Sequence, residues 1–340
     1  MGIKVIGTGS YLPPKIITND DIARSLDTTD EWIFSHTGIH SRHMAGDGET
    51  SATMGAKAAQ LAMEAAGVTK EEIGLIVVAT STPDYNPFPS TACIVQDLLG
   101  CTNAGAFDLQ AACAGFIYAL EQARGFVNFY PDKKAIVIGT ETLTRVVDWS
   151  DRSSCILFGD GAGAVVLAND ELPGAASLKT KAHTLLGADG KGAHFIARSG
   201  GCKDSLTINP STGVPEKAGP ILPEMTLQGH DVFAFAVRTL AKVASELCEK
   251  LGTRPEELDR VFAHQANARI IEATARRMKL PLEKFWLNLQ TTANTSAASI
   301  PISLDQAVRA GKLVEGMRIV MVGFGAGLTY GGTYCTWPNL

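Results

Sequence analysis

The stretch that decides the fold is FDLQAACAGFIYA, residues 107–119. It starts as a short apolar strand, continues through small residues around Cys113, and ends in an apolar helical run. This order predicts a strand-to-helix turn with Cys113 at or near a helix N-terminus, where unpaired N–H groups and the helix dipole stabilise an anion. Cysteines in such positions can have pKa values lowered to roughly 3.5–7.5. We therefore predict that Cys113 is a reactive nucleophile with a lowered pKa, and not a packing residue.

Landmarks around this stretch recur in the second half of the chain, in the same order. The pairs lie 180 to 185 residues apart and are Ile73 and Leu258, Thr80 and His264, Leu109 and Leu289, and the strands 135–138 and 319–322. This repeat predicts an α/β fold of two similar halves, residues 1–175 and 176–340, related by a pseudo-twofold axis. The glycine-rich region 187–222 shows little periodicity, and we expect it to be a long loop over the site.

The repeat brings three polar side chains to one place. Ligands in open α/β sheets bind beyond the carboxyl ends of the strands. Cys113 follows a strand of the first half, and His264 and Asn294 are predicted to occupy equivalent places in the second. Papain-like proteases also use cysteine, histidine and asparagine, but their cysteine lies near the mature N-terminus in a local signature that this chain lacks. We predict one site that contains all three residues.

Composition limits the class of protein. The chain has 340 residues, of which 45% are hydrophobic and 19% charged, as expected for a globular enzyme. Its net charge of −5 argues against general nucleic-acid binding. The seven cysteines form no CxxC pair, which fits a reducing compartment and argues against a zinc site. Without a signal peptide or an 18-residue apolar run, we expect a soluble, cytoplasmic protein with no membrane span and no bound metal.

Two glycine motifs could suggest a dinucleotide site, namely Gly159-x-Gly161-x-Gly163 and GFGAG at 323–327. In a dinucleotide-binding motif the glycines lead into a helix, whose N-terminus receives the pyrophosphate. Here β-type residues follow both motifs. We therefore expect no nicotinamide or flavin cofactor.

Short motifs along nearly the whole chain resemble those of one family. In chain order they are IGTGSYLP, DEWI, GLIVVATSTPD, AACAGF, FGDGAGA, HQAN-x-RI, NTSAAS and GFGAGLTYG. They are similar to the motifs of β-ketoacyl-acyl carrier protein synthase III, an acyltransferase with a thiolase-like fold. The resemblance implies two pseudo-duplicated halves in five layers. It also implies the decarboxylating Claisen condensation that initiates fatty-acid synthesis, in which a short acyl-coenzyme A such as acetyl-coenzyme A reacts with malonyl-acyl carrier protein to give a 3-oxoacyl-acyl carrier protein.

The resemblance implies a role for each matching residue. Cys113 accepts the acyl group, while His264 and Asn294 bind the malonyl thioester carbonyl. Gly325 and Ala326 belong to a loop that supplies a backbone N–H to an oxyanion hole. Six positions match the coenzyme A channel: Trp32, His36, Arg152, Phe233, Ala266 and Asn267.

The acyl pocket and the partners follow from the same resemblance. Phe88 and Phe158 match the pocket, and Phe88 is expected to reach the partner subunit of a homodimer. Acyl-coenzyme A and the acyl carrier protein are the expected partners, and no cofactor is bound. Three positions depart from the family pattern, since His36 and His40 replace frequent arginines and Ala326 replaces a frequent glycine. A neutral imidazole does not reproduce the phosphate contacts of a guanidinium.

A basic helix is expected after HQAN. Residues 267–279 carry Arg269, Arg276 and Arg277 against a single acid, Glu272. Arg269 and Arg276 are seven residues apart and so share a helix face. This face is a candidate docking site for the acidic acyl carrier protein, and the alternative is an ordinary solvated surface.

Other classes of function remain open. A condensing enzyme or acyltransferase of secondary metabolism with a different acyl donor or acceptor would share Cys113 and His264. A non-catalytic acyl-binding or scaffold protein is a further alternative, although the three reactive residues are intact. A thiolase or hydroxymethylglutaryl-type synthase fits less well, because Asn294 in NTSAAS suits decarboxylation and not proton abstraction.

Overall fold

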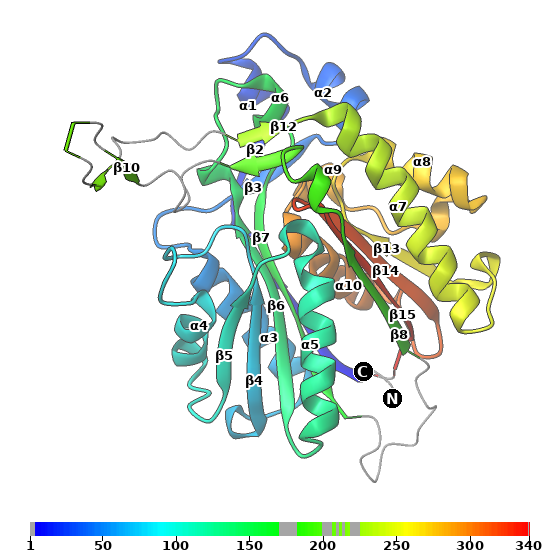
Figure 1. Cartoon of the computed structure of the whole chain (residues 1–340). Coiled ribbons are helices and arrows are strands. Elements are labelled where there is room, and N and C mark those ends of the chain that lie inside the picture. The colour runs from blue at the N-terminus through cyan, green and yellow to red at the C-terminus, as the bar shows by residue number, and fades with distance from the viewer. Residues whose placement is uncertain are drawn as a thin grey trace.

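The computed structural model describes residues 4–169, 182–198, 206–208, 211–212, 215–217, 225–338 and 340. Two sheets stand side by side, with helices between and outside them (Figure 1). The first sheet has the order β1 (Lys4–Tyr11), β7 (Asp160–Ala168), β6 (Lys134–Thr142), β4 (Ile73–Ala79) and β5 (Gly105–Leu109). The second has the order β13 (Arg260–Ala263), β14 (Arg318–Gly325), β15 (Thr329–Thr336) and β8 (Ala182–Ala188).

The two sheets repeat one pattern of pairing. A parallel pair, β4 with β6 or β13 with β14, is followed by an antiparallel strand, β7 or β15, and then by an antiparallel edge strand, β1 or β8. β5 also has a counterpart, because Phe285 forms a parallel bridge with Val261 of β13. The predicted α/β fold of two similar halves is therefore confirmed. The predicted boundary at residue 175 lies outside the described residues and stays a prediction.

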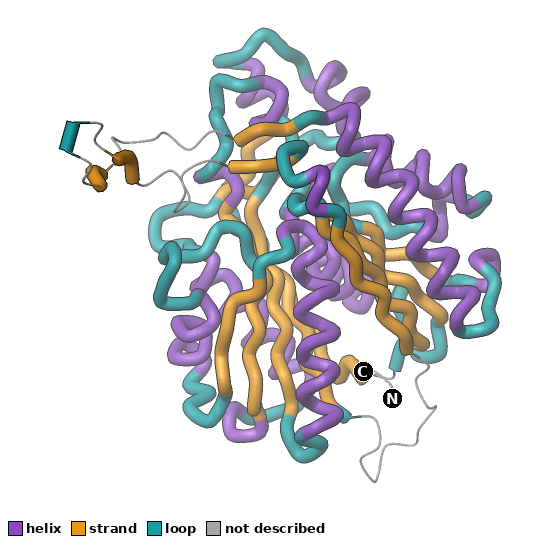
Figure 2. The backbone as a smooth tube through the Cα atoms, in the orientation of Figure 1, coloured by secondary structure: helices purple, strands orange, loops and turns teal. Residues whose placement is uncertain are grey.

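Five layers result from this repeat (Figures 1 and 2). Helix α3 (Ser51–Ala66) covers the outer face of the first sheet. Helices α5 (Gly115–Phe129) and α10 (Ser299–Arg309) lie between the sheets and contact both. Helix α7 (Gly229–Lys250) packs on the second sheet, and α8 (Ala268–Met278) packs on α7.

The glycine motif at 159–163 has a packing role. A β-carbon at Gly163 would lie 2.5 Å from the backbone N of Ile302 in α10. Only glycine lets β7 approach this central helix so closely. The glycines of FGDGAGA therefore let β7 of the first half pack closely against α10 of the second half.

Shorter elements complete the described chain. They are β2 (Lys15–Thr18), β3 (Ser41–Met44), α1 (Asn19–Ala23), α2 (Asp30–Thr37), α4 (Thr91–Leu99), α6 (Arg152–Cys155), β9 (Ile196–Arg198), β10 (Leu206–Ile208), β11 (Pro215–Lys217), β12 (Met225–Leu227) and α9 (Leu289–Thr292). None of the helices in the described ranges combines the length and apolar character needed to cross a bilayer.

The region 187–222, expected to be a long loop, contains short strands in its described parts. β9 pairs with β12, β10 pairs with β11, and β8 extends to Ala188. Strands of three residues are too short to show a period of two in the sequence, so the pattern was invisible there. The remaining positions of this region lie outside the described residues.

Candidate active site

A cavity of about 640 Å³ holds the three predicted reactive residues in its wall. Cys113 comes from the first half, and His264 and Asn294 come from the second. The wall also contains Ala193 and Ile196, so part of the 187–222 region borders the site as expected. The repeat in the sequence thus brings together residues that are up to 181 positions apart in the chain.

The predicted strand-to-helix turn is present at Cys113. β5 ends at Leu109, a 3₁₀ turn η2 covers Ala112–Ala114, and α5 begins at Gly115. Ala112 has a positive φ of 47°, a conformation that residues with a β-carbon seldom adopt. Such strain persists only where the surrounding structure demands it, and it concentrates at functional sites.

The predicted lowering of the Cys113 pKa is wrong for the enzyme without substrate. Burial raises the pKa of Cys113 to about 12, because a thiolate is poorly solvated there. The Glu141 carboxylate raises this pKa further, whereas a hydrogen bond with the Ser296 side chain lowers it. Desolvation is the largest of these effects. Cys113 is therefore a protonated thiol at neutral pH.

His264 directly follows β13 and is held by its neighbours. Its Nδ1 lies 2.7 Å from Ser299 Oγ, and its ring packs edge-on against Phe324 at a centroid distance of 5.6 Å. Burial lowers the pKa of His264 to about 3, so the imidazole is neutral at physiological pH. The Ser299 hydroxyl can give its one proton to Ser296 O, 2.8 Å away, or to His264 Nδ1. When Ser299 donates to Nδ1, the single N–H of the neutral imidazole is on Nε2, which can then act as a donor. When Ser299 donates to Ser296 O instead, Nδ1 carries the N–H and Nε2 has no proton to donate.

Asn294 is fixed by the first half of the chain. Its backbone N–H donates to Leu157 O at 2.9 Å, and its carbonyl accepts from Gly159 N–H at 3.1 Å. Its side-chain Oδ1 accepts the Ser296 N–H at 2.9 Å. This contact orients the amide and makes Nδ2 its donor group. Asn294 and a neutral His264 with Nε2–H can therefore both offer N–H donors.

The GFGAG loop packs directly on the nucleophile. A β-carbon at Gly325 would lie 2.6 Å from Cys113 N and 3.1 Å from the β-carbon of Ala112. Thr329 Oγ1 lies 2.8 Å from Ala111 O and 3.0 Å from Ala326 O, so it ties the two segments together. The loop and the Cys113 N–H therefore lie together, as an oxyanion hole shared between them requires.

We predict that Gly325→Ala reduces condensation by ~10²–10³, the usual cost of losing one oxyanion donor. The new methyl group would push the loop away from the Cys113 N–H. Gly323→Ala is the matched control, because its β-carbon would lie 3.4 Å from the nearest atom, Cys113 O, an ordinary contact. Steady-state condensation rates and melting temperatures of both variants test this. Equal activity of the two variants would contradict it.

The predicted coenzyme A residues fall into two groups. Phe233, Ala266 and Asn267 line the cavity itself. Trp32, His36 and Arg152 instead form a separate stack, with the Arg152 guanidinium 4.5 Å and the His36 ring 4.2 Å from the Trp32 ring centroid. Asn267 joins the groups, since its Nδ2 donates to His36 O at 3.0 Å.

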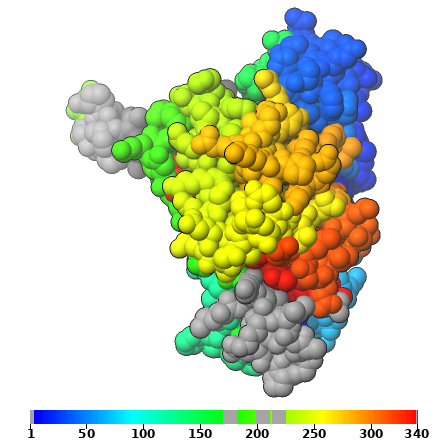
Figure 3. Space-filling model, turned by 90° about the vertical axis from the view of Figure 1, so that its right-hand side faces the viewer, coloured from blue at the N-terminus to red at the C-terminus, as the bar shows by residue number. Residues whose placement is uncertain are grey.

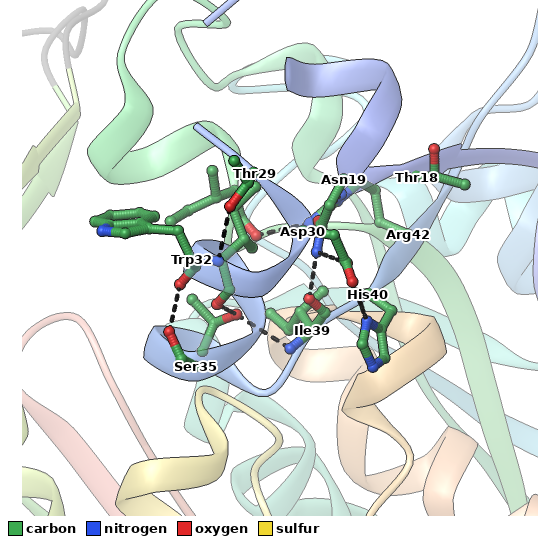
Figure 4. Close-up of polar contacts among 12 residues, drawn as sticks. Thr18, Asn19, Thr29, Asp30, Trp32, Ser35, Ile39, His40 and Arg42 are labelled. Atoms are coloured by element: carbon green, nitrogen blue, oxygen red, sulfur yellow. Dashed lines mark hydrogen bonds and ion pairs between the residues drawn. The ribbon is translucent and has the colours of Figure 1, made fainter. Parts of the chain in front are cut away.

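Helix α2, which carries Trp32, is anchored at its start (Figure 4). Thr29 caps the helix by accepting the Trp32 N–H at 3.1 Å. Asp30 accepts from Asn19 Nδ2 at 2.8 Å and pairs with His40 Nδ1 at 3.0 Å. The hydrogen bond from His40 is the main reason why the pKa of Asp30 is lowered. His40 therefore supports α2 and does not line the cavity.

The two predicted acyl-pocket residues lie in different places. Phe158 lines the cavity, and it forms a backbone bridge with Asn294. Phe88 does not line it and is 80% exposed in the single chain. Sequence reasoning missed Ser296, Ser299 and Glu141. Ser296 and Ser299 stand inside the NTSAAS motif and its helix, but nothing local distinguishes them from helix-capping residues.

The described residues contain no group of three or more His, Cys, Asp or Glu side chains placed to hold a metal ion. One cavity holds the thiol of Cys113, the imidazole of His264 and the amide of Asn294, supplied by two similar α/β halves. This arrangement defines a thiolase-fold acyltransferase. Comparison with known proteins makes this assignment more specific.

Two family models match the chain, "3-Oxoacyl-[acyl-carrier-protein (ACP)] synthase III" over residues 107–190 and its "C terminal" counterpart over residues 248–337. The β-ketoacyl-[acyl-carrier-protein] synthase III of Xanthomonas euvesicatoria is 46% identical over 96% of each chain. The 3-oxoacyl-[acyl-carrier-protein] synthase III of Aquifex aeolicus is 41% identical, with a TM-score of 0.87 over 99% of this chain and all of the other. The priming β-ketosynthase of the R1128 polyketide pathway is 37% identical, with a TM-score of 0.87 over 99% of this chain and 97% of the other.

The chain therefore belongs to the β-ketoacyl-[acyl-carrier-protein] synthase III family of condensing enzymes.

Proposed function

We propose that this enzyme condenses a short acyl-coenzyme A with malonyl-acyl carrier protein, releases carbon dioxide, and thereby starts fatty-acid synthesis in the cytoplasm. The observation that carries the proposal is the position of Cys113 at a strand-to-helix turn, in the same cavity wall as His264 and Asn294. The thioester substrates bring their own activation, so the reaction needs no bound cofactor.

Each residue has a distinct task in this scheme. Cys113 attacks the acyl thioester, and the Cys113 N–H and the Gly325–Ala326 loop stabilise the oxyanion. Asn294 Nδ2 and His264 Nε2 donate to the malonyl thioester carbonyl as decarboxylation turns it into an enolate. The enolate carbon then attacks the acyl group on Cys113. In this scheme the Ser299 hydroxyl donates to His264 Nδ1, because this arrangement provides the required Nε2–H.

The Trp32, His36 and Arg152 stack fits the adenine end of coenzyme A. The Arg152 guanidinium and the His36 ring both stack on Trp32, and a planar base could insert between these groups. Asn267 connects this stack to the cavity, so a coenzyme A arm could run from the stack past Asn267 to Cys113. His36 adds stacking but lacks the charge of a guanidinium, so phosphate binding rests more heavily on Arg152.

Intact-protein mass spectrometry after exposure to acetyl-, butyryl- and octanoyl-coenzyme A tests the proposal. We expect an acyl adduct on Cys113, formed fastest with the two- and four-carbon thioesters. The likeness to the R1128 priming β-ketosynthase supports a second candidate, a priming enzyme of secondary metabolism. Fastest acylation by a longer chain, together with carbon dioxide release from malonyl-acyl carrier protein, would favour that candidate.

A homodimer is part of the proposal. β5 is an edge strand of the first sheet, and Phe107 on it is 40% exposed. Tyr85 and Phe88 are also strongly exposed, which is unusual for large apolar side chains near a sheet edge. Pairing of two β5 edges would cover these groups and let Phe88 close the partner's acyl pocket. Phe88→Ala should then speed octanoyl transfer relative to acetyl transfer, and an unchanged ratio would exclude this role for Phe88.

Helix α8 is proposed to dock the acyl carrier protein. It lies on the face shown in Figure 3, next to the N-terminal segment that carries α2. Arg269, Arg276 and Arg277 are exposed on it, and Arg276 pairs only loosely with Glu272 at 3.9 Å. Ala266 and Asn267, just before this helix, and Ile270 in its first turn line the cavity. A carrier bound to α8 would thus lie close to the site.

We predict that Arg269→Glu raises the KM for malonyl-acyl carrier protein roughly 3- to 10-fold, in line with the modest strength of exposed charge pairs. The self-acylation rate with acetyl-coenzyme A should stay the same, and the effect on KM should shrink as salt is added. Lys312→Glu, at an exposed cation that does not line the cavity, is the control. Equal changes in both variants would show that only net charge matters.

A further inference from the structure

Arg42 is a buried cation to which the scheme above gives no task. It lies in β3 with none of its surface exposed. Burial lowers the pKa of Arg42 to about 10, so the guanidinium stays charged at neutral pH. Its Nη1 donates to Asn19 Oδ1 at 2.9 Å, and its Nη2 donates to Ile156 O at 2.8 Å. Both acceptors are neutral. Burying a charge against neutral groups is costly, which sets Arg42 apart from an ordinary packing residue.

The first of these contacts leads to helix α2, which carries Trp32. Asn19 is also fully buried, and its Nδ2 donates to Asp30 Oδ1 at 2.8 Å and to Ile39 O at 2.6 Å. Asp30 is the first residue of α2 and Ile39 lies just beyond its end, so Asn19 holds both ends of the helix (Figure 4). A guanidinium can only donate, so it draws Oδ1 toward itself and leaves Nδ2 for α2. Arg42 therefore sets the orientation of the Asn19 amide.

The second contact leads to the backbone that holds Asn294. Ile156, whose carbonyl accepts from Arg42, directly precedes Leu157. Leu157 O accepts the Asn294 N–H at 2.9 Å, and the Gly159 N–H donates to Asn294 O at 3.1 Å. Leu157 and Asn294 both line the cavity. Arg42 is thus tied, one residue away, to the segment that fixes Asn294.

Packing supports the second contact. β3 packs on α9, which ends two residues before Asn294. A β-carbon at Gly159 would lie 3.0 Å from the β-carbon of Arg42 and 2.6 Å from Thr292 O in α9. The three segments therefore meet with no spare space, and a close-packed interior transmits a displacement from one segment to the next.

We propose that Arg42 is a positioning residue that holds helix α2 and the enolate donor Asn294 in one arrangement. This inference rests on the proposed roles of Trp32 in coenzyme A binding and of Asn294 in decarboxylation. Arg42 does not line the cavity, so it acts through its two contacts and not on substrate. The planar fork of a guanidinium suits this task, because it presents donors in fixed directions. Both half-reactions thus depend on one buried support.

Arg42→Met tests the proposal by removing the donors while keeping an unbranched side chain. We expect the KM for acetyl-coenzyme A in self-acylation to rise roughly 5- to 10-fold, because α2 loses its anchored Asn19. The rate of malonyl-acyl carrier protein decarboxylation should fall by ~10-fold, because Asn294 is displaced.

Asn19→Ala separates positioning from a general loosening of the fold. It removes the contact with α2 and leaves the Ile156 carbonyl beside Arg42. The KM for acetyl-coenzyme A should therefore rise as in Arg42→Met, while decarboxylation stays near the wild-type rate. A general loosening would instead lower decarboxylation in both variants, in proportion to the fall in melting temperature.

Arg260→Met is the matched control. Arg260 also donates to a backbone carbonyl, that of Glu283, and within the described part of the chain both arginines have a buried Nε with no hydrogen-bond partner. It lies at the start of β13 and does not line the cavity, so neither kinetic constant should change.

Arg42→Lys is the second variant, for the case that Arg42→Met folds poorly. It keeps the charge but lacks the planar fork, so it should show both defects at a smaller size. A wild-type enzyme without an acyl adduct on Cys113 would overturn the proposed function itself. Wild-type values of either constant in a folded Arg42 variant, or equal loss of decarboxylation in Asn19→Ala, would overturn only the positioning role.

Discussion

Cys113→Ala will abolish acyl transfer and leave the fold intact. The thiol is the nucleophile in the cavity wall, and loss of a covalent nucleophile costs several orders of magnitude in rate. Alanine already stands on both sides of Cys113, so the change fits the small-residue turn. Intact-protein mass spectrometry after exposure to acetyl-coenzyme A is the measurement, with melting temperature as the check on folding.

Cys335→Ala is the matched control for this experiment. Cys335 is fully buried in β15, burial raises its pKa to about 12, and it does not line the cavity. The control should acquire the acyl mass like the wild type, even if its core packing is weakened. An acyl adduct on Cys113→Ala would show that another residue is the nucleophile.

His264→Ala and Asn294→Ala should separate the two half-reactions. Both residues are proposed to stabilise the enolate, so malonyl decarboxylation should fall by ~10²–10³ in each variant. Self-acylation of Cys113 should largely survive, because its oxyanion donors are the Cys113 N–H and the GFGAG loop. Carbon dioxide release and acyl-enzyme formation are measured separately on the same samples.

A third variant, Ser299→Ala, tests which ring nitrogen of His264 carries the proton. Ser299→Ala removes the partner that selects Nε2–H, so it should weaken decarboxylation less than His264→Ala does. Equal loss of acylation and decarboxylation in His264→Ala and Asn294→Ala would contradict the division of labour. It would indicate instead that the whole site had shifted.

The architecture could be predicted because its signals are local or periodic. The turn at Cys113 is encoded by a strand, small residues and a helical run within 13 positions. The repeat spacing of 180 to 185 residues placed His264 near the cysteine without any knowledge of contacts. The repeat placed Asn294 there as well, and the resemblance of NTSAAS to one family supported that assignment. The cavity wall contains all three.

Other features depend on contacts that no local pattern carries. The helix position of Cys113 suggested a lowered pKa, but the burial that raises it comes from segments of both halves. Glu141 stands between Thr140 and Thr142 at the end of its strand, and its hydrogen-bond partners Ser81 and Thr82 come from a different segment of the chain. The role proposed for Phe88 is also absent from any local sequence pattern, because it requires a second copy of the chain.

The contact between Gly325 and Cys113 has a consequence for synthesis of the protein on the ribosome. Gly325 is made 212 residues after Cys113, and at ~5–20 residues per second that interval lasts roughly 10–40 s. During this time the nascent chain carries its nucleophile without the loop that completes the oxyanion hole. A chain truncated before β14 would therefore lack the loop beside Cys113, and we expect thioesters to acylate its cysteine less efficiently.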